Sequence, residues 1–150
     1  MDKTNVESFK LDHTKVKAPY LRIAKDLEYN GVKVRKFDLR FCQPNKEVME
    51  TGAIHAIEHI MAEQFNNPEY GIKEIIDFSP MGCRTGFYII MFTEFDEKEL
   101  LNKIKLYLKN LLDYNEIPAA NEIQCGNYRD MDLKGAKEIV RKVIDNLELF

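Results

Sequence analysis

The chain lacks a long apolar run, a signal-like N-terminus and a regular set of cysteines, and each absence removes a class of protein. Its longest uninterrupted apolar run, Phe87 to Phe92, is far shorter than the roughly 20 residues that cross a bilayer. The N-terminal segment MDKTNVESFKLDH has no apolar stretch of the kind found in signal peptides. We therefore expect a cytoplasmic protein that does not enter a membrane.

The chain also lacks an excess of charge of one sign. It has 22 Lys and Arg against 25 Asp and Glu, mixed along its length, for a formal net charge of −3. No basic region indicates nucleic acid or an anionic membrane as a partner, so a small soluble substrate is favoured. With 150 residues, 45% of them hydrophobic, the chain is expected to form a single domain over residues 1–150.

Cysteine is scarce, with three residues at wide spacings: Cys42, Cys83 and Cys125. An odd number at such spacings argues against a disulfide framework and suits a reducing compartment. Cys42 ends a strand-like run and is predicted to be a small buried apolar residue without a chemical role. Cys83 lies in a loop beside Arg84, where a nearby guanidinium favours the reactive thiolate; the alternative for Cys83 is a structural thiol.

Periodicity predicts strands and helices in an α+β order. Alternating or β-rich runs predict strands over 20–27, 32–41, 74–78 and 86–92, and the Asn30-Gly31 turn joins the first two into a hairpin. Helical spacing of apolar residues predicts helices over 52–65, 97–112 and 133–147. The expected fold is an antiparallel sheet with helices packed on one face.

The most informative segment is His55-Ala-Ile-Glu58-His59. Histidines at i and i+4 lie on one side of a helix, close enough for two imidazoles to share one cation. Glu58 lies beside them, where it can act as a general base. The other side of the helix is apolar and is predicted to be buried: Ile54, Ala56, Ile57, Ile60 and Met61. A lone histidine is more often an ordinary surface or hydrogen-bonded residue, but two of three histidines in one pentapeptide favour a metal site.

A catalytic metal site usually needs a third protein ligand. Cys125, followed by Gly126, is the best candidate, and a buried inert thiol is its alternative. A His₂Cys set suits zinc, ferrous iron and cobalt equally. The H-x-x-E-H pattern also occurs in inverzincin peptidases. An inverzincin-like metallopeptidase, with a downstream glutamate as third ligand, and a non-catalytic metal-binding protein with a closed four-ligand site are therefore the competing hypotheses.

Five segments spread over the chain point to one known family: 8–14, 37–46, 54–59, 75–88 and 117–126, the fourth of which contains SPMGCRTGFY. On these segments the chain resembles the S-ribosylhomocysteine lyases of the LuxS family. The resemblance implies an α+β homodimer of two-layer sandwiches. It also implies cleavage of the thioether of S-ribosylhomocysteine to homocysteine and 4,5-dihydroxy-2,3-pentanedione, an autoinducer precursor in quorum sensing, by enolisations and β-elimination.

The same resemblance assigns the chemistry to named residues. It implies that His55, His59 and Cys125 bind one divalent metal per subunit, natively ferrous iron, for which zinc or cobalt can substitute. It further implies that Glu58 and Cys83 are the catalytic acid/base pair.

The resemblance also implies four substrate-binding residues. Ser8, His13 and Arg40 match positions that reach the ribose and neighbouring groups across the homodimer interface, and Asp77 matches a position near the homocysteine end. Taken without the resemblance, each has an ordinary explanation as a cap, a surface imidazole or a strand-edge charge.

Overall fold

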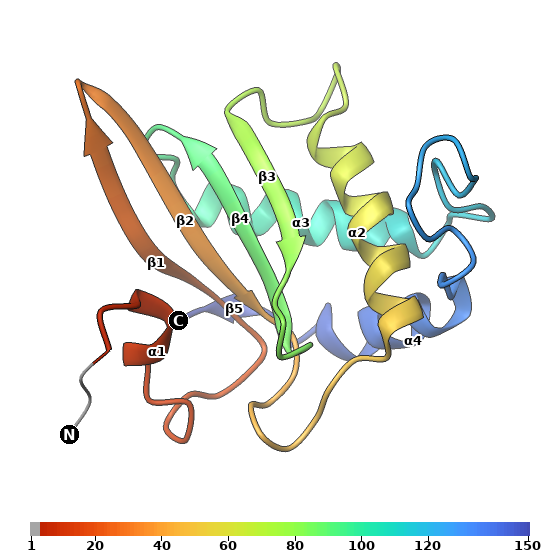
Figure 1. Cartoon of the computed structure of the whole chain (residues 1–150), viewed down its shortest axis with the longest axis horizontal. Coiled ribbons are helices and arrows are strands. Elements are labelled where there is room, and N and C mark those ends of the chain that lie inside the picture. Colours follow the sequence, from red (N-terminus) through yellow and green to blue (C-terminus); the bar gives the residue numbers. More distant parts are fainter. Residues whose placement is uncertain (1–3) are drawn as a thin grey trace.

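The computed structural model describes residues 4–150, and over these residues a five-stranded sheet is combined with four helices (Figure 1). The strands are β1 (Tyr20–Tyr29), β2 (Val32–Arg40), β3 (Ile75–Pro80), β4 (Gly86–Phe92) and β5 (Glu148–Leu149). The helices are α1 (Glu7–Lys10), α2 (Thr51–Phe65), α3 (Glu97–Leu111) and α4 (Leu133–Val143). Within the described part of the chain, no helix has the length and apolarity to span a bilayer.

The sheet has the order β3-β4-β2-β1-β5, and every neighbouring pair is antiparallel except β1 and β5, which are parallel. The α+β class is confirmed, but the expectation of a wholly antiparallel sheet is wrong at this edge. β5 has only two residues, too few to give an alternating pattern. The predicted hairpin is confirmed: Asn30 and Gly31 both have positive φ, 50° and 79°, as the tight turn between twisted strands requires.

The predicted α2 and α3 are confirmed to within one residue at each end. Each of the two later helices begins at an aspartate cap: Asp96 accepts a hydrogen bond from Lys98 N at 3.2 Å, and Asp132 accepts one from Gly135 N at 2.9 Å. The predicted last helix is too long, because α4 ends at Val143. The chain then turns to reach the sheet, where the Phe150 amide donates to Leu21 O at 2.9 Å.

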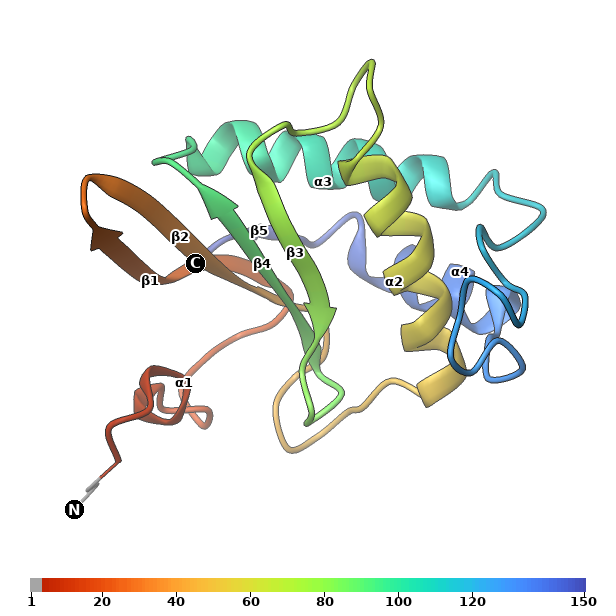
Figure 2. The ribbon, with the colours of Figure 1, turned by 45° about the horizontal axis from the view of Figure 1, so that its top comes forward.

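The hydrophobic core lies between one face of the sheet and the helices α2, α3 and α4 (Figure 2). Every residue of the predicted apolar face of α2 is buried, and such a side chain contributes about 1.5–3 kcal/mol when removed from water. Cys42 is buried as predicted, and burial raises the pKa of its thiol.

The short helix α1 lies on the other face of the sheet from the core. Its Glu7 pairs with Arg22 at 3.4 Å, and Arg22 points to the opposite face from its buried neighbour Leu21. The expectation that all helices cover one face is therefore wrong for α1.

Gly86 allows β2 and β4 to approach closely at the end where the candidate site lies. A Cβ atom at this position would collide with the Leu39 carbonyl oxygen and would lie 2.9 Å from the Arg40 Cα. Gly86 is the register partner of Arg40. The absent side chain therefore brings the loop that precedes β4 next to Arg40.

Candidate metal centre and the adjacent Cys83 loop

Two histidines of α2 and a cysteine from the loop before α4 come together. The rings of His55 and His59 have centroids 4.8 Å apart, as expected one helical turn apart. Cys125 Sγ lies 3.4 Å from His55 Nε2. The three candidate ligand atoms all lie within 4.8 Å of one another. The grouping predicted from the sequence is therefore present, although Cys125 is 70 residues from His55.

Backbone carbonyls fix the orientation of both imidazoles. His55 Nδ1 lies 2.9 Å from Asp130 O, and His59 Nδ1 lies 2.7 Å from Pro118 O. A carbonyl oxygen can only accept, so each Nδ1 donates, and in the neutral ring Nε2 then carries the lone pair that a metal needs. Metal-ligating histidines commonly donate their second nitrogen in this way.

The donor set fits a divalent transition metal. Two neutral imidazoles and one thiolate suit zinc, ferrous iron and cobalt, and three protein ligands are the number that catalytic sites use. Cys125 Sγ also accepts a hydrogen bond from the Asn127 amide at 3.4 Å. The loop between α3 and α4 therefore supplies one candidate ligand and the carbonyls that orient the other two.

Glu58 is half-buried on α2 and lines two cavities, each of which is also lined by one of the two histidines. The first, of about 310 Å³, is shared with His55, Gly82 and Arg84. The second, of about 300 Å³, is shared with His59. A carboxylate between two cavities beside the candidate ligands is accessible to a small substrate and can exchange protons with it.

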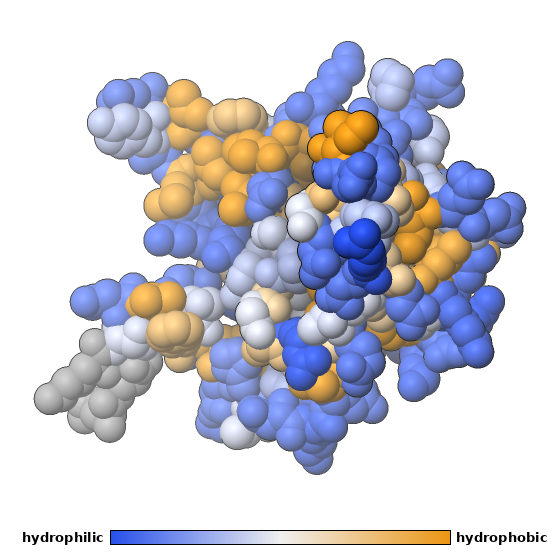
Figure 3. Space-filling model, turned by 45° about the vertical axis from the view of Figure 1, so that its right-hand side comes forward, coloured by the Kyte–Doolittle hydropathy of each residue, from blue (hydrophilic) through white to orange (hydrophobic). Residues whose placement is uncertain are grey.

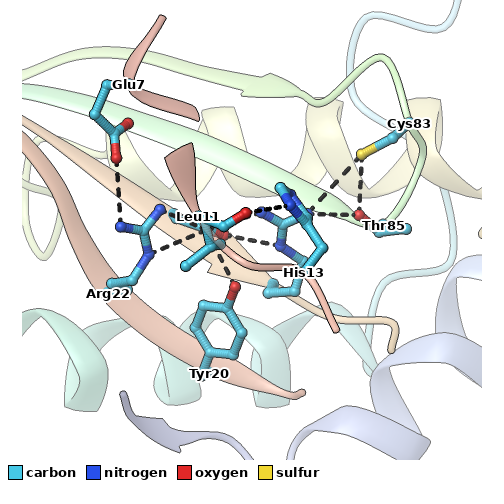
Figure 4. A network of polar contacts seen from close by, with 9 residues as sticks. Glu7, Leu11, His13, Tyr20, Arg22, Cys83 and Thr85 are labelled. Atoms are coloured by element: carbon cyan, nitrogen blue, oxygen red, sulfur yellow. Dashed lines mark hydrogen bonds and ion pairs between the residues drawn. The ribbon is translucent and has the colours of Figure 1, made fainter. Parts of the chain in front are cut away.

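Cys83 lies in the exposed loop between β3 and β4, and its sulfur points to the end of the sheet (Figure 4). Its Sγ lies 3.0 Å from Thr85 Oγ1 and 4.0 Å from Arg40 Nη1. The sequence suggested Arg84 as the nearby cation, but Arg84 donates to Met49 O at 3.3 Å. The guanidinium near the sulfur is therefore that of Arg40.

Arg40 is held by a buried carboxylate. It is 2% exposed, and Asp38, which is 0% exposed, accepts hydrogen bonds from its Nε at 3.1 Å and its Nη2 at 2.8 Å. Burial alone would lower the pKa of Arg40, but the hydrogen bonds and charge of Asp38 raise it overall. Arg22 donates to the same carboxylate at 3.1 Å, so two guanidiniums share one buried anion.

Tyr20, which lies beside Arg22 in Figure 4, completes the group around Asp38. Its hydroxyl donates to Asp38 Oδ2 at 3.2 Å. Burial, and then the charge of Asp38, raise the pKa of Tyr20 to about 12. Tyr20 therefore stays protonated near neutral pH and remains a donor to this carboxylate.

The predicted substrate-binding residues are distributed over the face of the sheet opposite the core. Arg40 alternates with the buried Leu39 on β2, and the exposed Asp77 of β3 pairs with Ile90 on β4. Ser8 of α1 reaches the same face: burial raises the pKa of Tyr88, and a hydrogen bond with Ser8 partly offsets this effect.

His13 is half-buried, and its Nδ1 lies 2.8 Å from Leu11 O. The contacts described for it are local, so the structure does not bring it together with the metal centre.

Sequence reasoning missed Asp38, Thr85 and the two carbonyls. Asp38 precedes Arg40 by two residues on one strand, and this same-face spacing was an available signal. No sequence pattern marked Thr85 as a neighbour of Arg40 and Cys83. The carbonyls of Pro118 and Asp130 belong to the backbone, which every residue carries, so no residue type could have marked them.

Comparison with known proteins gives one consistent result. A family model described as S-Ribosylhomocysteinase (LuxS) matches residues 6–149. An S-ribosylhomocysteine lyase of Clostridium botulinum is 50% identical over 93% of this chain and 91% of its own length. Others are found in Clostridioides difficile, 50% identical over the same two shares, and in Staphylococcus haemolyticus, 47% identical over 97% of this chain and 92% of its own.

Proposed function

The chain belongs to the LuxS family and is an S-ribosylhomocysteine lyase, and from this premise we propose how its residues divide the chemistry. His55, His59 and Cys125 hold a divalent metal, and Glu58 and Cys83 carry protons. The observation that supports this best is the orientation of both imidazoles by carbonyls at Nδ1. The two other hypotheses, a metallopeptidase and a non-catalytic metal-binding protein, have no support among these relatives.

The reaction is a redox-neutral elimination. S-Ribosylhomocysteine yields homocysteine and 4,5-dihydroxy-2,3-pentanedione; no oxidant or water is consumed. Two enolisations move the sugar carbonyl from C1 to C3, and loss of the C4 proton then expels the sulfur from C5. The bound metal, which we propose to be ferrous iron with zinc or cobalt able to substitute, supplies Lewis acidity that acidifies the C–H groups next to the carbonyl.

The chain's own groups move the protons. Glu58 lines the cavities next to both histidines, so its carboxylate takes a proton from carbon and returns it at the neighbouring carbon or oxygen. The Cys83 sulfur, 4.0 Å from the Arg40 guanidinium, is the second proton carrier. Two carriers suit a reaction in which protons leave and return at successive carbons.

The activity is tested by release of thiol. We expect the anaerobically purified, metal-loaded protein to produce one homocysteine thiol for each S-ribosylhomocysteine consumed, measured with a chromogenic thiol reagent. Samples without substrate and samples treated with a chelator are the controls. No thiol release from metal-loaded protein would contradict the function, and cleavage of unrelated peptides would favour the peptidase.

We further propose that the active unit is a homodimer. The sheet face opposite the core exposes a group of apolar side chains. Figure 3 shows apolar residues gathered near the end of the sheet where the β1–β2 hairpin turns. The members of the group are Leu27, Val32, Ile76 and Phe92. An exposed apolar group of this kind is typical of an interface. In the proposed dimer, Ser8, His13 and Arg40 reach the ribose in the partner's site, and Asp77 lies near the homocysteine end.

Shared sites allow inactive chains to complement each other. A mixed dimer of His13→Ala and Glu58→Gln chains has one site with both changes and one intact site. We expect random exchange of the two homodimers to restore up to about a quarter of wild-type activity, because half of the dimers are mixed and each has one working site. Thiol release after dissociation and reassociation measures this.

The matched control is a mixed dimer of Glu58→Gln and His59→Ala chains. These residues are adjacent on α2, so each site of the mixed dimer carries one change and no activity should return. No recovery with His13→Ala after confirmed exchange would mean that His13 serves its own chain.

The proposal also covers the cellular compartment of the protein, the bounds of its domain and the biological use of its product. The three cysteines are all free, which supports a reducing compartment such as the cytoplasm. The family match over residues 6–149 supports a single domain over residues 1–150. The product serves as a quorum-sensing precursor.

A further inference from the structure

Thr85 lies between the Arg40 guanidinium and the Cys83 sulfur. It directly precedes β4 and is 4% exposed. Its Oγ1 lies 2.9 Å from Arg40 Nη1 and 3.0 Å from Cys83 Sγ. Arg40 Nη1 itself is 4.0 Å from the sulfur. The hydroxyl is therefore the closer polar neighbour of Cys83 and is in contact with both groups.

The direction of the two hydrogen bonds follows from the donor inventory. A guanidinium has donors and no acceptor, so Thr85 Oγ1 must accept from Arg40. The hydroxyl has a single hydrogen, and among residues 4–150 the only other contact of Oγ1 is with Cys83 Sγ. A thiolate can only accept, so when Cys83 is ionised that hydrogen points to the sulfur. The order of donation is Arg40 to Thr85 to Cys83, in which each bond polarises the next.

Asp38 fixes the start of this chain of donors. Because Asp38 occupies Nε and Nη2 of Arg40, Nη1 is the nitrogen left for Thr85. Arg40 ends β2, and Thr85 directly precedes β4, which pairs with β2 next to it through Gly86. Groups at the ends of paired strands are held more rigidly than groups within a loop.

We propose that Thr85 is a positioning residue for Cys83, which orients the sulfur and stabilises its negative charge by donating the hydroxyl hydrogen to Sγ. This inference rests on the proton-transfer role proposed for Cys83. Thr85 does not itself need to touch the substrate. Its contribution is to keep the sulfur in one orientation and in the form that can accept a proton.

The test compares Thr85→Val, which keeps the shape and loses the hydroxyl, with Thr85→Ser, which keeps the hydroxyl and loses the methyl group. The metal-loaded proteins are treated with iodoacetamide over a range of pH, and alkylation at each cysteine is resolved by mass spectrometry. We expect the midpoint of the Cys83 profile to rise by about one pH unit in Thr85→Val, as loss of one hydrogen bond to a charged group implies. Thr85→Ser should stay close to wild type, and the buried Cys42 is the internal control.

The outcome decides between positioning and packing. An unchanged Cys83 profile in Thr85→Val, or equal shifts in the valine and serine variants, would overturn the inference. If Thr85→Val does not give a wild-type melting curve, Thr85→Ala takes its place, with the same expected shift. Alkylation needs no substrate, so failure of the lyase function appears separately, as absence of thiol release by the wild-type protein. In that assay we expect Thr85→Val to lower kcat roughly tenfold with little change in KM, and Thr85→Ser to restore kcat.

Discussion

Glu58→Gln and Cys83→Ala should each lower thiol release from S-ribosylhomocysteine by at least about two orders of magnitude, the usual effect of removing a positioned acid or base, while the protein keeps its metal. Glu58 lies in the cavities beside the histidines, but it is not a member of the His55, His59 and Cys125 group. The Cys83 sulfur contacts Thr85 and Arg40 instead. Initial rates at saturating substrate, with metal content measured on the same samples, check this expectation.

Two matched variants separate chemistry from folding. Cys42→Ala removes a thiol that has no proposed role and should keep near wild-type turnover. Cys83→Ser keeps the size of the side chain but supplies a group that is hardly ionised near neutral pH, so it should behave like Cys83→Ala. Near wild-type rates in Glu58→Gln or in Cys83→Ala would reject the proton-carrying role of that residue.

His55→Ala, His59→Ala and Cys125→Ala are each expected to remove most of the metal from the anaerobically purified protein. The wild-type protein should carry about one divalent ion per chain. Loss of one of three ligands removes binding energy and also the geometry of the remaining two. Elemental analysis of each purified variant measures the occupancy, and activity should fall in parallel.

His13→Ala is the control for the loss of an imidazole. His13 is the one histidine outside the metal-binding group, and its described contact is with Leu11 O. We expect His13→Ala to keep full metal occupancy even if its activity falls. Full occupancy in all three ligand variants would disprove the assignment of the metal centre.

The sequence alone determined the features that depend on local order. The helix of His55 and His59 follows from spacing and from an apolar face, and the structure confirms both. The β1–β2 hairpin follows from Asn30-Gly31, because only a few residue types adopt positive φ easily. The burial of Cys42 was predicted from its small apolar side chain directly after Phe41, and the structure confirms it.

Other parts of the candidate site needed the family resemblance as well as the residues. From the residues alone, metal binding and an inert buried thiol were comparable explanations of Cys125. Without the resemblance, Arg40 and Asp77 would have been interpreted as ordinary charges at strand edges. The residues at these positions are common types, and their neighbours along the chain do not show what they face. The relatives show the family and the activity.

Tertiary structure alone decided the contacts between distant segments. Arg40 is 43 residues from Cys83 and 45 from Thr85, and they meet because Gly86 lets β2 and β4 close together. For the same reason Arg40, and not the adjacent Arg84, became the cation beside the sulfur. The parallel β5 and the position of α1 across the sheet also lie outside local patterning. Short segments bury too little surface to specify their own partners, so the assembled sheet determines where they bind.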